Sequence, residues 1–287
     1  MEKILTRRAY GKINLGLDVV RRRPDGYHEV KMIMQMVDLY DELEMSGNGN
    51  GEIEIVTDNA ALPNDEHNLI YKAILKYREF TGQTKGVRVS LKKNIPIAAG
   101  MAGGSTDAAA ALILYNTLCQ ENLTKQKLCE IGVRVGADVP YCIMGGTMLS
   151  EGIGEILTPL PSPPEAFLVI AKPDISVSTK YVYEHLQLQS LERHPDIDGM
   201  RRAIEEGNLK GICDRMENVL ESVTVENYPV IAEIKEKLLQ NGAENALMSG
   251  SGPTVFAVFT EKREAELAKE KLFETGLCRQ LFVTTFI

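Results

Sequence analysis

The sequence predicts an α+β protein that is built from two domains. Residues 3–60 alternate apolar and polar positions between turn signals, which is typical of antiparallel strands. Helical periodicity begins near Asn68 and recurs in both halves of the chain. The segment PLPSPP, near residue 160, is stiff and typical of an interdomain connection. We therefore expect one domain over residues 1–160 and a second over residues 161–287.

In the N-terminal half, the sequence predicts strands that lead into a short glycine-rich loop. The expected elements are strands within residues 3–60, a helix from about residue 68, a strand over 87–91, and helices over about 104–119 and 124–135. The last of these helices should end at Gly136, because the left-handed C-cap of a helix is usually glycine. Residues 136–140, GADVP, would then form a tight loop.

In the C-terminal half, the sequence predicts a second set of mixed strands and helices. Its expected strands cover residues 167–171, 246–249, 254–259 and 281–286, and its expected helices cover 180–188, 200–206, 209–220, 230–240 and 261–275. The last of these helices, which has a charged and amphipathic pattern, lies between the final two strands in chain order.

Composition excludes several classes of function. The net charge of −8 argues against a nucleic-acid partner, because phosphate backbones are bound through clustered positive charge. The 5 cysteines form no CxxC pair and the 4 histidines show no metal-ligand spacing, so we expect reduced thiols and no metal site held by the protein itself. No apolar run suits a signal peptide or a membrane span, and we expect a cytoplasmic protein without a membrane partner.

The segment PIAAGMAGGSTDA, which begins at Pro96, is the strongest candidate for a binding site. Its small residues allow successive backbone N–H groups to point at one anion, and the helix that follows would present its positive end to the same place. No lysine follows the glycines, so the segment is not a Walker loop. With an anion bound there, Ser105 and Thr106 could then hold a metal ion. The alternative is a glycine-rich connection without a ligand.

Two segments near the N-terminus place polar side chains where they can act together. Lys12 and Asn14 share one face of a predicted strand, although an exposed sheet face would also accommodate them. The segment RPDGYHEV delivers Tyr27 and His28 side by side after a turn, and the alternative is a hairpin with a surface aromatic. The basic run at residues 21–23 is either a solvated turn or a source of positive potential for an anionic ligand.

Two later segments are also candidates for functional loops. Asp138 lies in GADVP directly after a predicted helix, where it is either a reactive carboxylate or a capping and turn residue. The segment MSGSGPTVF, residues 248–256, lies between two predicted strands and could simply be a tight β turn.

Taken in chain order, AYGKINLGL, RPDGYHEV, PIAAGMAGGSTDAA, GADVP and LMSGSGPTVF resemble the motifs of the GHMP kinases, which phosphorylate small alcohols and acids with ATP. RPDGYHEV and GADVP separate the chain from homoserine, galactose and mevalonate kinases. They favour the branch that acts on 4-diphosphocytidyl-2-C-methyl-D-erythritol. The resemblance implies the GHMP kinase fold, with an N-terminal half like the second domain of a small-subunit ribosomal protein and a ferredoxin-like C-terminal half. It also implies an active site in the cleft between the halves.

The resemblance further implies a reaction: ATP-dependent phosphorylation of the substrate's 2-hydroxyl, giving the 2-phosphate and ADP in non-mevalonate isoprenoid precursor biosynthesis. Magnesium would arrive with ATP. Lys12 and Asp138 match the catalytic pair. The phosphate loop would consist of Pro96, Ile97, Ala98, Ala99, Gly100, Met101, Ala102, Gly103, Gly104, Ser105 and Thr106. The remaining matches are Asn14, Tyr27, His28, Thr179 and Tyr183 for the cytidyl diphosphate substrate, and Asn68 and Lys93 for adenine.

The sequence departs from the commoner superfamily loop at Ala99, Met101 and Thr106, and each replacement stays compact or apolar. Two other functions remain open at this point. One is a nucleotide-binding module without catalysis, which would have no need of both Lys12 and Asp138. The other is a kinase for a different small alcohol, for which RPDGYHEV would have no role.

Overall fold

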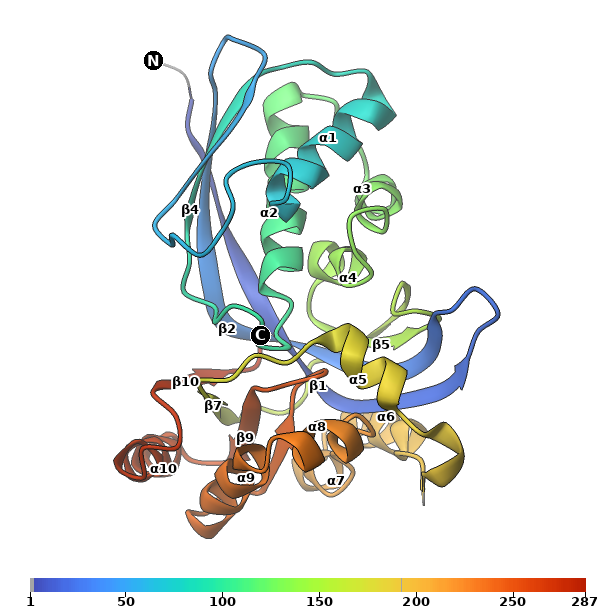
Figure 1. The fold of residues 1–287 in the computed structure, drawn as a ribbon, viewed down its shortest axis with the longest axis vertical. Coiled ribbons are helices and arrows are strands. Elements are labelled where there is room, and N and C mark those ends of the chain that lie inside the picture. Colours follow the sequence, from blue (N-terminus) through green and yellow to red (C-terminus); the bar gives the residue numbers. More distant parts are fainter. Residues whose placement is uncertain (1–2, 192) are drawn as a thin grey trace. The chain divides into compact units, whose positions relative to one another are not determined.

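A computed structural model describes residues 3–191 and 193–287 of the chain. The chain folds into two compact units, which are discontinuous in sequence (Figure 1). The first contains the chain up to Gly11, Leu39–Ile97 and Ala102–Gly145, and the second contains Lys12–Asp38, Ala98–Met101 and Gly146–Ile287. The domain limits 1–160 and 161–287 therefore remain a prediction.

Two long strands, β1 (Leu5–Arg22) and β2 (His28–Gly47), pair with each other and contribute residues to both units. The sequence predicted strands here, and the structure confirms them. In the first unit, β2 pairs antiparallel with β4, with Glu42 opposite Lys92. The other elements of this unit are β3 (Ile53–Thr57), α1 (Leu69–Thr81), β4 (Val87–Lys92), α2 (Gly103–Cys119), α3 (Lys125–Gly132) and α4 (Val139–Met144).

The two predicted elements on either side of the glycine-rich loop are confirmed. Strand β4 buries every second residue, as a half-buried strand should, and pairs parallel with β3. Helix α2 is buried almost all round from Thr106 to Leu112, which its run of small alanines permits in a tightly packed layer. Helix α1 begins after Asn68 as expected, because the Asn68 side chain accepts a hydrogen bond from the Ile70 N–H.

The prediction that Gly136 caps a helix is wrong. Helix α3 already ends at Gly132, residues 133–135 continue as turns, and the Gly136 N–H donates to the Gly132 carbonyl at 3.1 Å. Gly136 does not have a positive φ, so its conformation is not the left-handed one of a glycine C-cap. The expected loop GADVP is also shorter than predicted, because α4 begins at Val139.

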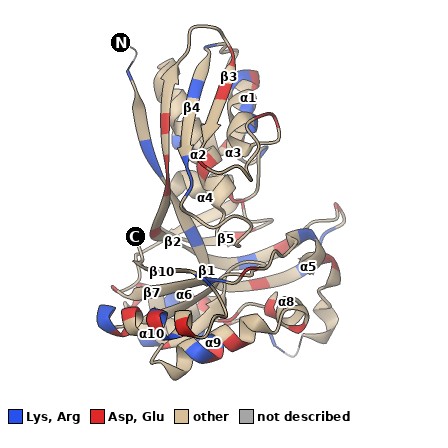
Figure 2. Ribbon diagram, turned by 60° about the vertical axis from the view of Figure 1, so that its left-hand side comes forward, with Lys and Arg blue, Asp and Glu red and all other residues tan. Residues whose placement is uncertain are grey.

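The second unit contains a four-stranded antiparallel sheet in the order β10–β7–β9–β8. Its central strands are buried, and the predicted strands and final helix are confirmed. The elements are β7 (Phe167–Lys172), α5 (Thr179–His185), a 3-10 helix (Leu188–Ser190), α6 (Ile197–Glu205), α7 (Leu209–Cys213), α8 (Glu221–Asn227), α9 (Val230–Gln240), β8 (Asn245–Met248), β9 (Val255–Phe259), α10 (Lys262–Glu274) and β10 (Gln280–Thr285). Acidic and basic residues are interspersed along α9 and α10 (Figure 2).

Two strands of the second unit were not predicted. Strand β5 (Thr147–Glu151) pairs with β2, and β6 (Ile156–Leu160) pairs with β5. The start of the proline-rich segment is therefore a strand as well as a connection. Pro159 is tolerated because β6 lies at the edge of its sheet, where a missing N–H breaks no ladder.

The expected helix over residues 209–220 is wrong in its second half. Helix α7 ends at Cys213, and the chain then pairs with β1: the Leu17 N–H donates to the Glu217 carbonyl and the Val219 N–H donates to the Leu17 carbonyl. Pairing with a distant strand thus overrides the local helical pattern. In the described part of the chain, no helix is both long and apolar enough to cross a membrane.

Candidate active site

The loop from Pro96 to Thr106 has the backbone of an anion-binding site. Ala98, Gly100 and Ala102 have positive φ values of 51°, 71° and 56°. Alternation of left-handed and right-handed residues turns successive N–H groups towards one side, and small side chains make this conformation accessible. Ala102 is the N-cap of α2 and provides no side-chain hydrogen bond. The first N–H groups of this 17-residue helix therefore lack a side-chain cap, as an anion site requires.

Gly100 fits its place in the loop only because it has no side chain. A Cβ atom at Gly100 would lie 2.1 Å from the carbonyl oxygen of Ser249. The Ser249 hydroxyl in turn donates to the Gly100 carbonyl at 3.0 Å. The glycine-rich segment MSGSGP therefore supports the middle of the phosphate loop, in addition to making the turn between β8 and β9.

Lys12 is held between this loop and Asn14. Its backbone N–H donates to the Met101 carbonyl at 3.1 Å, and its ammonium group donates to Asn14 Oδ1 at 2.8 Å. Lys12 is only 5% exposed and Asn14 is fully buried, so the alternative of a solvated sheet face is wrong. A buried lysine beside a phosphate loop is suited to stabilise negative charge.

Asp138 occupies the N-cap position of α4 in the first unit. Its backbone is right-handed helical, and its side chain accepts no capping hydrogen bond. The capping half of the alternative is therefore not supported, whereas Asp138 does lie in the turn that precedes α4. The expected approach of Asp138 to Lys12, which belongs to the second unit, remains a prediction.

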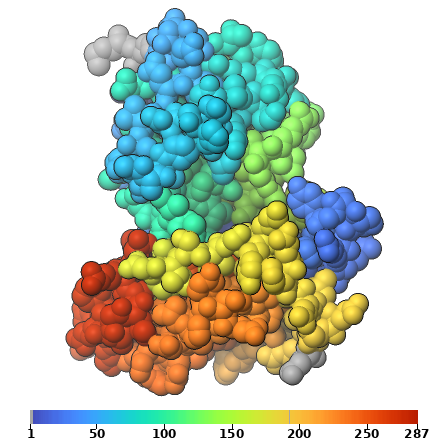
Figure 3. All heavy atoms as spheres, viewed as in Figure 1, coloured from blue at the N-terminus to red at the C-terminus, as the bar shows by residue number. Residues whose placement is uncertain are grey.

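Two of the residues predicted to bind the cytidyl group, Tyr27 and His28, lie at the turn between β1 and β2. This turn lies beside the segment that carries α5 (Figure 3), and the rings of His28 and Tyr183 are 5.2 Å apart. Tyr27 is 60% exposed, which leaves its ring accessible for stacking. Burial, followed by the charge of Arg22, lowers the pKa of His28 below its usual value, so the imidazole is neutral at pH 7.

Thr179, at the start of α5, shares a 2.8 Å hydrogen bond with the hydroxyl of Ser251. The predicted wall for cytosine is thus connected to the segment that supports Gly100. Of the basic run, Arg21 pairs with Glu29 and Arg23 with Asp25, all at the exposed turn. Exposed pairs of this kind contribute little to stability and indicate a solvated turn.

The two residues predicted to contact adenine use their side chains within the first unit. Asn68 caps α1, and its Nδ2 also donates to the Pro63 carbonyl at 2.7 Å. The Lys93 side chain is 3% exposed and its ammonium group pairs with Asp41 and Asp107. The exposed atoms of Lys93 therefore belong to its backbone, which is the part of this residue that remains open to adenine.

Sequence reasoning missed Asn218, which is 3% exposed. Its Nδ2 donates to the carbonyls of Met248 and Gly250, both at 2.8 Å, and so fixes the segment beneath Gly100. A cavity of about 420 Å³ lies on the same unit, and Glu221 and Lys235 in its lining pair with each other. The serines of MSGSGP belong to a motif that can be recognised in the sequence, whereas no local sequence pattern indicates a role for Asn218.

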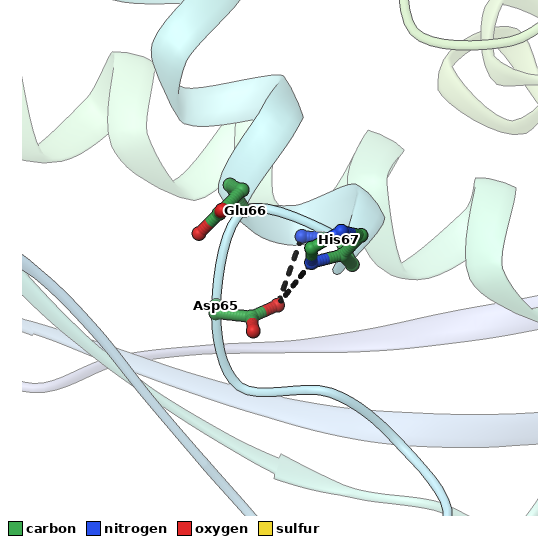
Figure 4. A group of neighbouring side chains, drawn as sticks. All are labelled: Asp65, Glu66 and His67. Atoms are coloured by element: carbon green, nitrogen blue, oxygen red, sulfur yellow. Dashed lines mark hydrogen bonds and ion pairs between the residues drawn. The ribbon is translucent and has the colours of Figure 1, made fainter.

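A separate group of exposed side chains precedes α1: Asp65, Glu66 and His67 (Figure 4). Asp65 Oδ1 accepts a hydrogen bond from the His67 N–H at 3.0 Å and lies 3.0 Å from His67 Nδ1. These bonds lower the pKa of Asp65 and define a turn stabilised by an aspartate side chain. We assign the group to this turn.

Comparison with known proteins places the fold and the loop in one class. The family model for the GHMP kinases N terminal domain matches residues 68–146, and the model for the GHMP kinases C terminal domain matches residues 200–277. A homoserine kinase from Cytophaga hutchinsonii shares the fold, with a TM-score of 0.78 at 21% identity over 100% of this chain and 95% of that one. The class defined by the fold and the site is thus the GHMP kinases, as the motifs predicted.

Closer relatives define the family within this class. A protein of Lachnoclostridium phytofermentans named 4-diphosphocytidyl-2-C-methyl-D-erythritol kinase is 49% identical over 99% of this chain and 97% of its own length. A protein of the same name from Geobacillus kaustophilus is 46% identical, with the same coverage. A crystal structure of 4-(cytidine 5'-diphospho)-2C-methyl-D-erythritol kinase matches with a TM-score of 0.82 at 30% identity, over 98% of this chain and 99% of that one. The chain belongs to the 4-diphosphocytidyl-2-C-methyl-D-erythritol kinase family.

Proposed function

We propose that the protein transfers the γ-phosphoryl group of ATP to the 2-hydroxyl of 4-diphosphocytidyl-2-C-methyl-D-erythritol, giving the 2-phosphate and ADP. This is a step of non-mevalonate isoprenoid precursor biosynthesis, and the supply of ATP favours the cytoplasm as its location. The observation that carries the proposal is the position of Lys12, whose backbone holds the phosphate loop and whose ammonium group is oriented by Asn14. The names of the relatives support the choice of substrate.

The phosphate loop binds the triphosphate through its backbone. The left-handed residues Ala98, Gly100 and Ala102 and the uncapped start of α2 supply N–H donors to it. The Ser105 hydroxyl forms no hydrogen bond in the described part of the chain and is partly exposed, so it fits as a ligand for magnesium, whereas Thr106 is buried. When bound with ATP, magnesium would neutralise charge on the phosphates.

Asp138 accepts the proton of the 2-hydroxyl as that oxygen forms its bond to the γ-phosphorus and the bond to the leaving ADP oxygen breaks. A positioned base contributes roughly 100-fold to 10,000-fold to the rate. Lys12 offsets the negative charge that develops at the transferred group. Its burial strengthens this effect, since water screens the charge less.

The cytidyl group binds at the turn between β1 and β2. Tyr27 stacks on the cytosine ring, and Tyr183 provides a second aromatic wall. His28, neutral at pH 7, retains one donor and one acceptor nitrogen for the base. Asn14 and Thr179 supply the other polar groups of this site.

Product analysis tests the proposal directly. The protein is incubated with ATP, magnesium and 4-diphosphocytidyl-2-C-methyl-D-erythritol, and products are identified by mass spectrometry and phosphorus NMR. We expect ADP and the 2-phosphate in equal amounts. Binding of ATP without any product would instead identify a nucleotide-binding module, and product formed only from another alcohol would identify a different kinase.

A further inference from the structure

Three charged side chains are buried together in the first unit, outside the groups that the proposed mechanism uses. Asp41 on β2, Lys93 after β4 and Asp107 on α2 have side-chain exposures of 0%, 3% and 5%. The Lys93 ammonium group donates to both carboxylates, and its distance to Asp107 Oδ2 is 2.7 Å. We propose that this Asp41–Lys93–Asp107 cluster is a positioning device that holds both ends of the phosphate loop in the geometry that binds ATP.

The cluster fixes the point where the chain enters the loop. Asp41 Oδ1 accepts hydrogen bonds from the backbone N–H groups of Asn94 and Ile95, at 2.6 and 2.8 Å. These residues directly precede Pro96, where the loop begins. The Asn94 side chain adds a bond to the Tyr40 carbonyl at 2.8 Å. Because Asp41 is fully buried, its bonds are protected from competition with water.

The same cluster fixes the point where the chain leaves the loop. Asp107 follows Ser105 and Thr106 in the first turns of α2, and its bond to Lys93 ties the start of that helix to the end of β4. Gly103, the first residue of α2, lies close against the cluster, since a Cβ there would be 3.0 Å from Lys93 Nζ. One ammonium group therefore links the two ends of the loop through a single pair of carboxylates.

The test compares Asp107→Ala with Asp107→Asn, and it rests on the proposed function because it uses the same reaction. Alanine removes the bond to Lys93 but keeps the Lys93–Asp41 pair. Because alanine is itself a strong helix former, it is also compatible with α2. Asparagine keeps an oxygen that accepts from Lys93. We expect Asp107→Ala to raise the KM for ATP about 10-fold, equivalent to about 1.4 kcal/mol, with the KM for the cytidyl substrate unchanged. The KM for ATP of Asp107→Asn should equal the wild-type value.

Thr117→Ala is the matched control, because Thr117 is exposed on the same helix and should leave both KM values unchanged. Calorimetric binding of a non-hydrolysable ATP analogue with magnesium, without cytidyl substrate, should show the same 10-fold loss for Asp107→Ala. Equal analogue affinity in wild type and Asp107→Ala would overturn the proposal, as would an equal loss in Asp107→Ala and Asp107→Asn. Failure of the wild type to phosphorylate the cytidyl substrate would count against the proposed function alone, since the binding measurement does not depend on it.

Discussion

The buried part of β1 and the exposed turn that follows it contribute to the proposed site in opposite ways. Lys12 and Asn14 are buried and hydrogen-bonded to each other. Tyr27, at the turn, is 60% exposed, and His28 is partly exposed. Groups that act on charge must be fixed in advance, because reorganisation would reduce their effect on the transition state. Groups that recognise a flat base need an accessible ring. Substitutions in the two regions should therefore affect different kinetic constants.

The largest effect is expected at Asp138, the proposed base. Asp138→Asn keeps the size of the side chain but removes its ability to accept a proton, so kcat should fall roughly 100-fold to 10,000-fold. The affinity for ATP, measured by calorimetry, should change less than about twofold, well within the scatter of a non-contact substitution. A parallel loss of ATP affinity would show that Asp138 supports the nucleotide site and takes no part in proton transfer.

Lys12→Met should reduce kcat by about 100-fold to 1,000-fold, the cost of removing one fixed electrostatic contact to the transition state. Methionine preserves the length and the backbone N–H that holds the Met101 carbonyl. Steady-state kinetics should show a near-normal KM for the cytidyl substrate. Lys31→Met is a suitable control, because Lys31 lies on the neighbouring strand and pairs with Asp198. A rise in KM without a fall in kcat would contradict the expectation that substitutions in β1 affect kcat and substitutions in the turn affect KM.

Tyr27→Ala should act on KM where Lys12→Met acts on kcat. Loss of about 1–3 kcal/mol of stacking predicts a KM for the cytidyl substrate that is roughly 5-fold to 150-fold higher. The KM for ATP should stay constant. Tyr181→Ala provides the control, since Tyr181 is an exposed aromatic residue on α5 that stacks on His185. The same KM in Tyr27→Ala and wild type would exclude Tyr27 from the site.

The smallest effect concerns stability and extends the comparison to the buried cluster. Burial raises the pKa of Asp107 in the folded protein to about 8, above its value in the unfolded chain, with Lys93 opposing this shift and Asp41 adding to it. The protonated group therefore stabilises the fold at low pH. That contribution declines as pH rises from about 4 and is lost above about 8. Asp107→Asn does not titrate. Its stability relative to wild type, from urea unfolding, should therefore rise between pH 5 and pH 9 by more than about 1.4 kcal/mol, the value of one pKa unit.

A difference in unfolding free energy that stays constant from pH 5 to pH 9 would mean that Asp107 is already ionised in the folded protein. Thr117→Ala, on the same helix, should give a constant difference and so reports any general pH effect. The test needs no substrate and does not depend on the reaction.

Local patterns explain how much of the site could be predicted from the sequence. Lys12 and Asn14 were placed on one face because strands alternate with period two, and the loop was recognised by its small residues between a strand and a helix. The support of Gly100 by Ser249 was not predictable, because a contact across about 150 positions leaves no periodic signal. Asn218 was missed for the same reason, since residues around it pair with β1 against their own helical pattern.

The charged cluster shows the same limit from another direction. Asp41, Lys93 and Asp107 each look like ordinary surface residues in sequence, where charged side chains are mostly exposed. Only the packing of β2, the end of β4 and α2 brings them together in the interior. The resemblance to the GHMP kinases indicated Lys93 as a contact for adenine, which stays a prediction, but it could not show that the side chain pairs with two buried carboxylates.

The contact between Gly100 and the Ser249 carbonyl also gives a simple way to recognise copies of this enzyme that have lost activity. At 2.1 Å there is no room for even one methyl group, and neither partner is the flexible end of a side chain that could swing aside. A duplicated gene that carries alanine or a larger residue at this position would have to displace two loops at once. We expect such a copy to lose the loop geometry that is proposed to bind ATP, and inspection of a single codon would identify it.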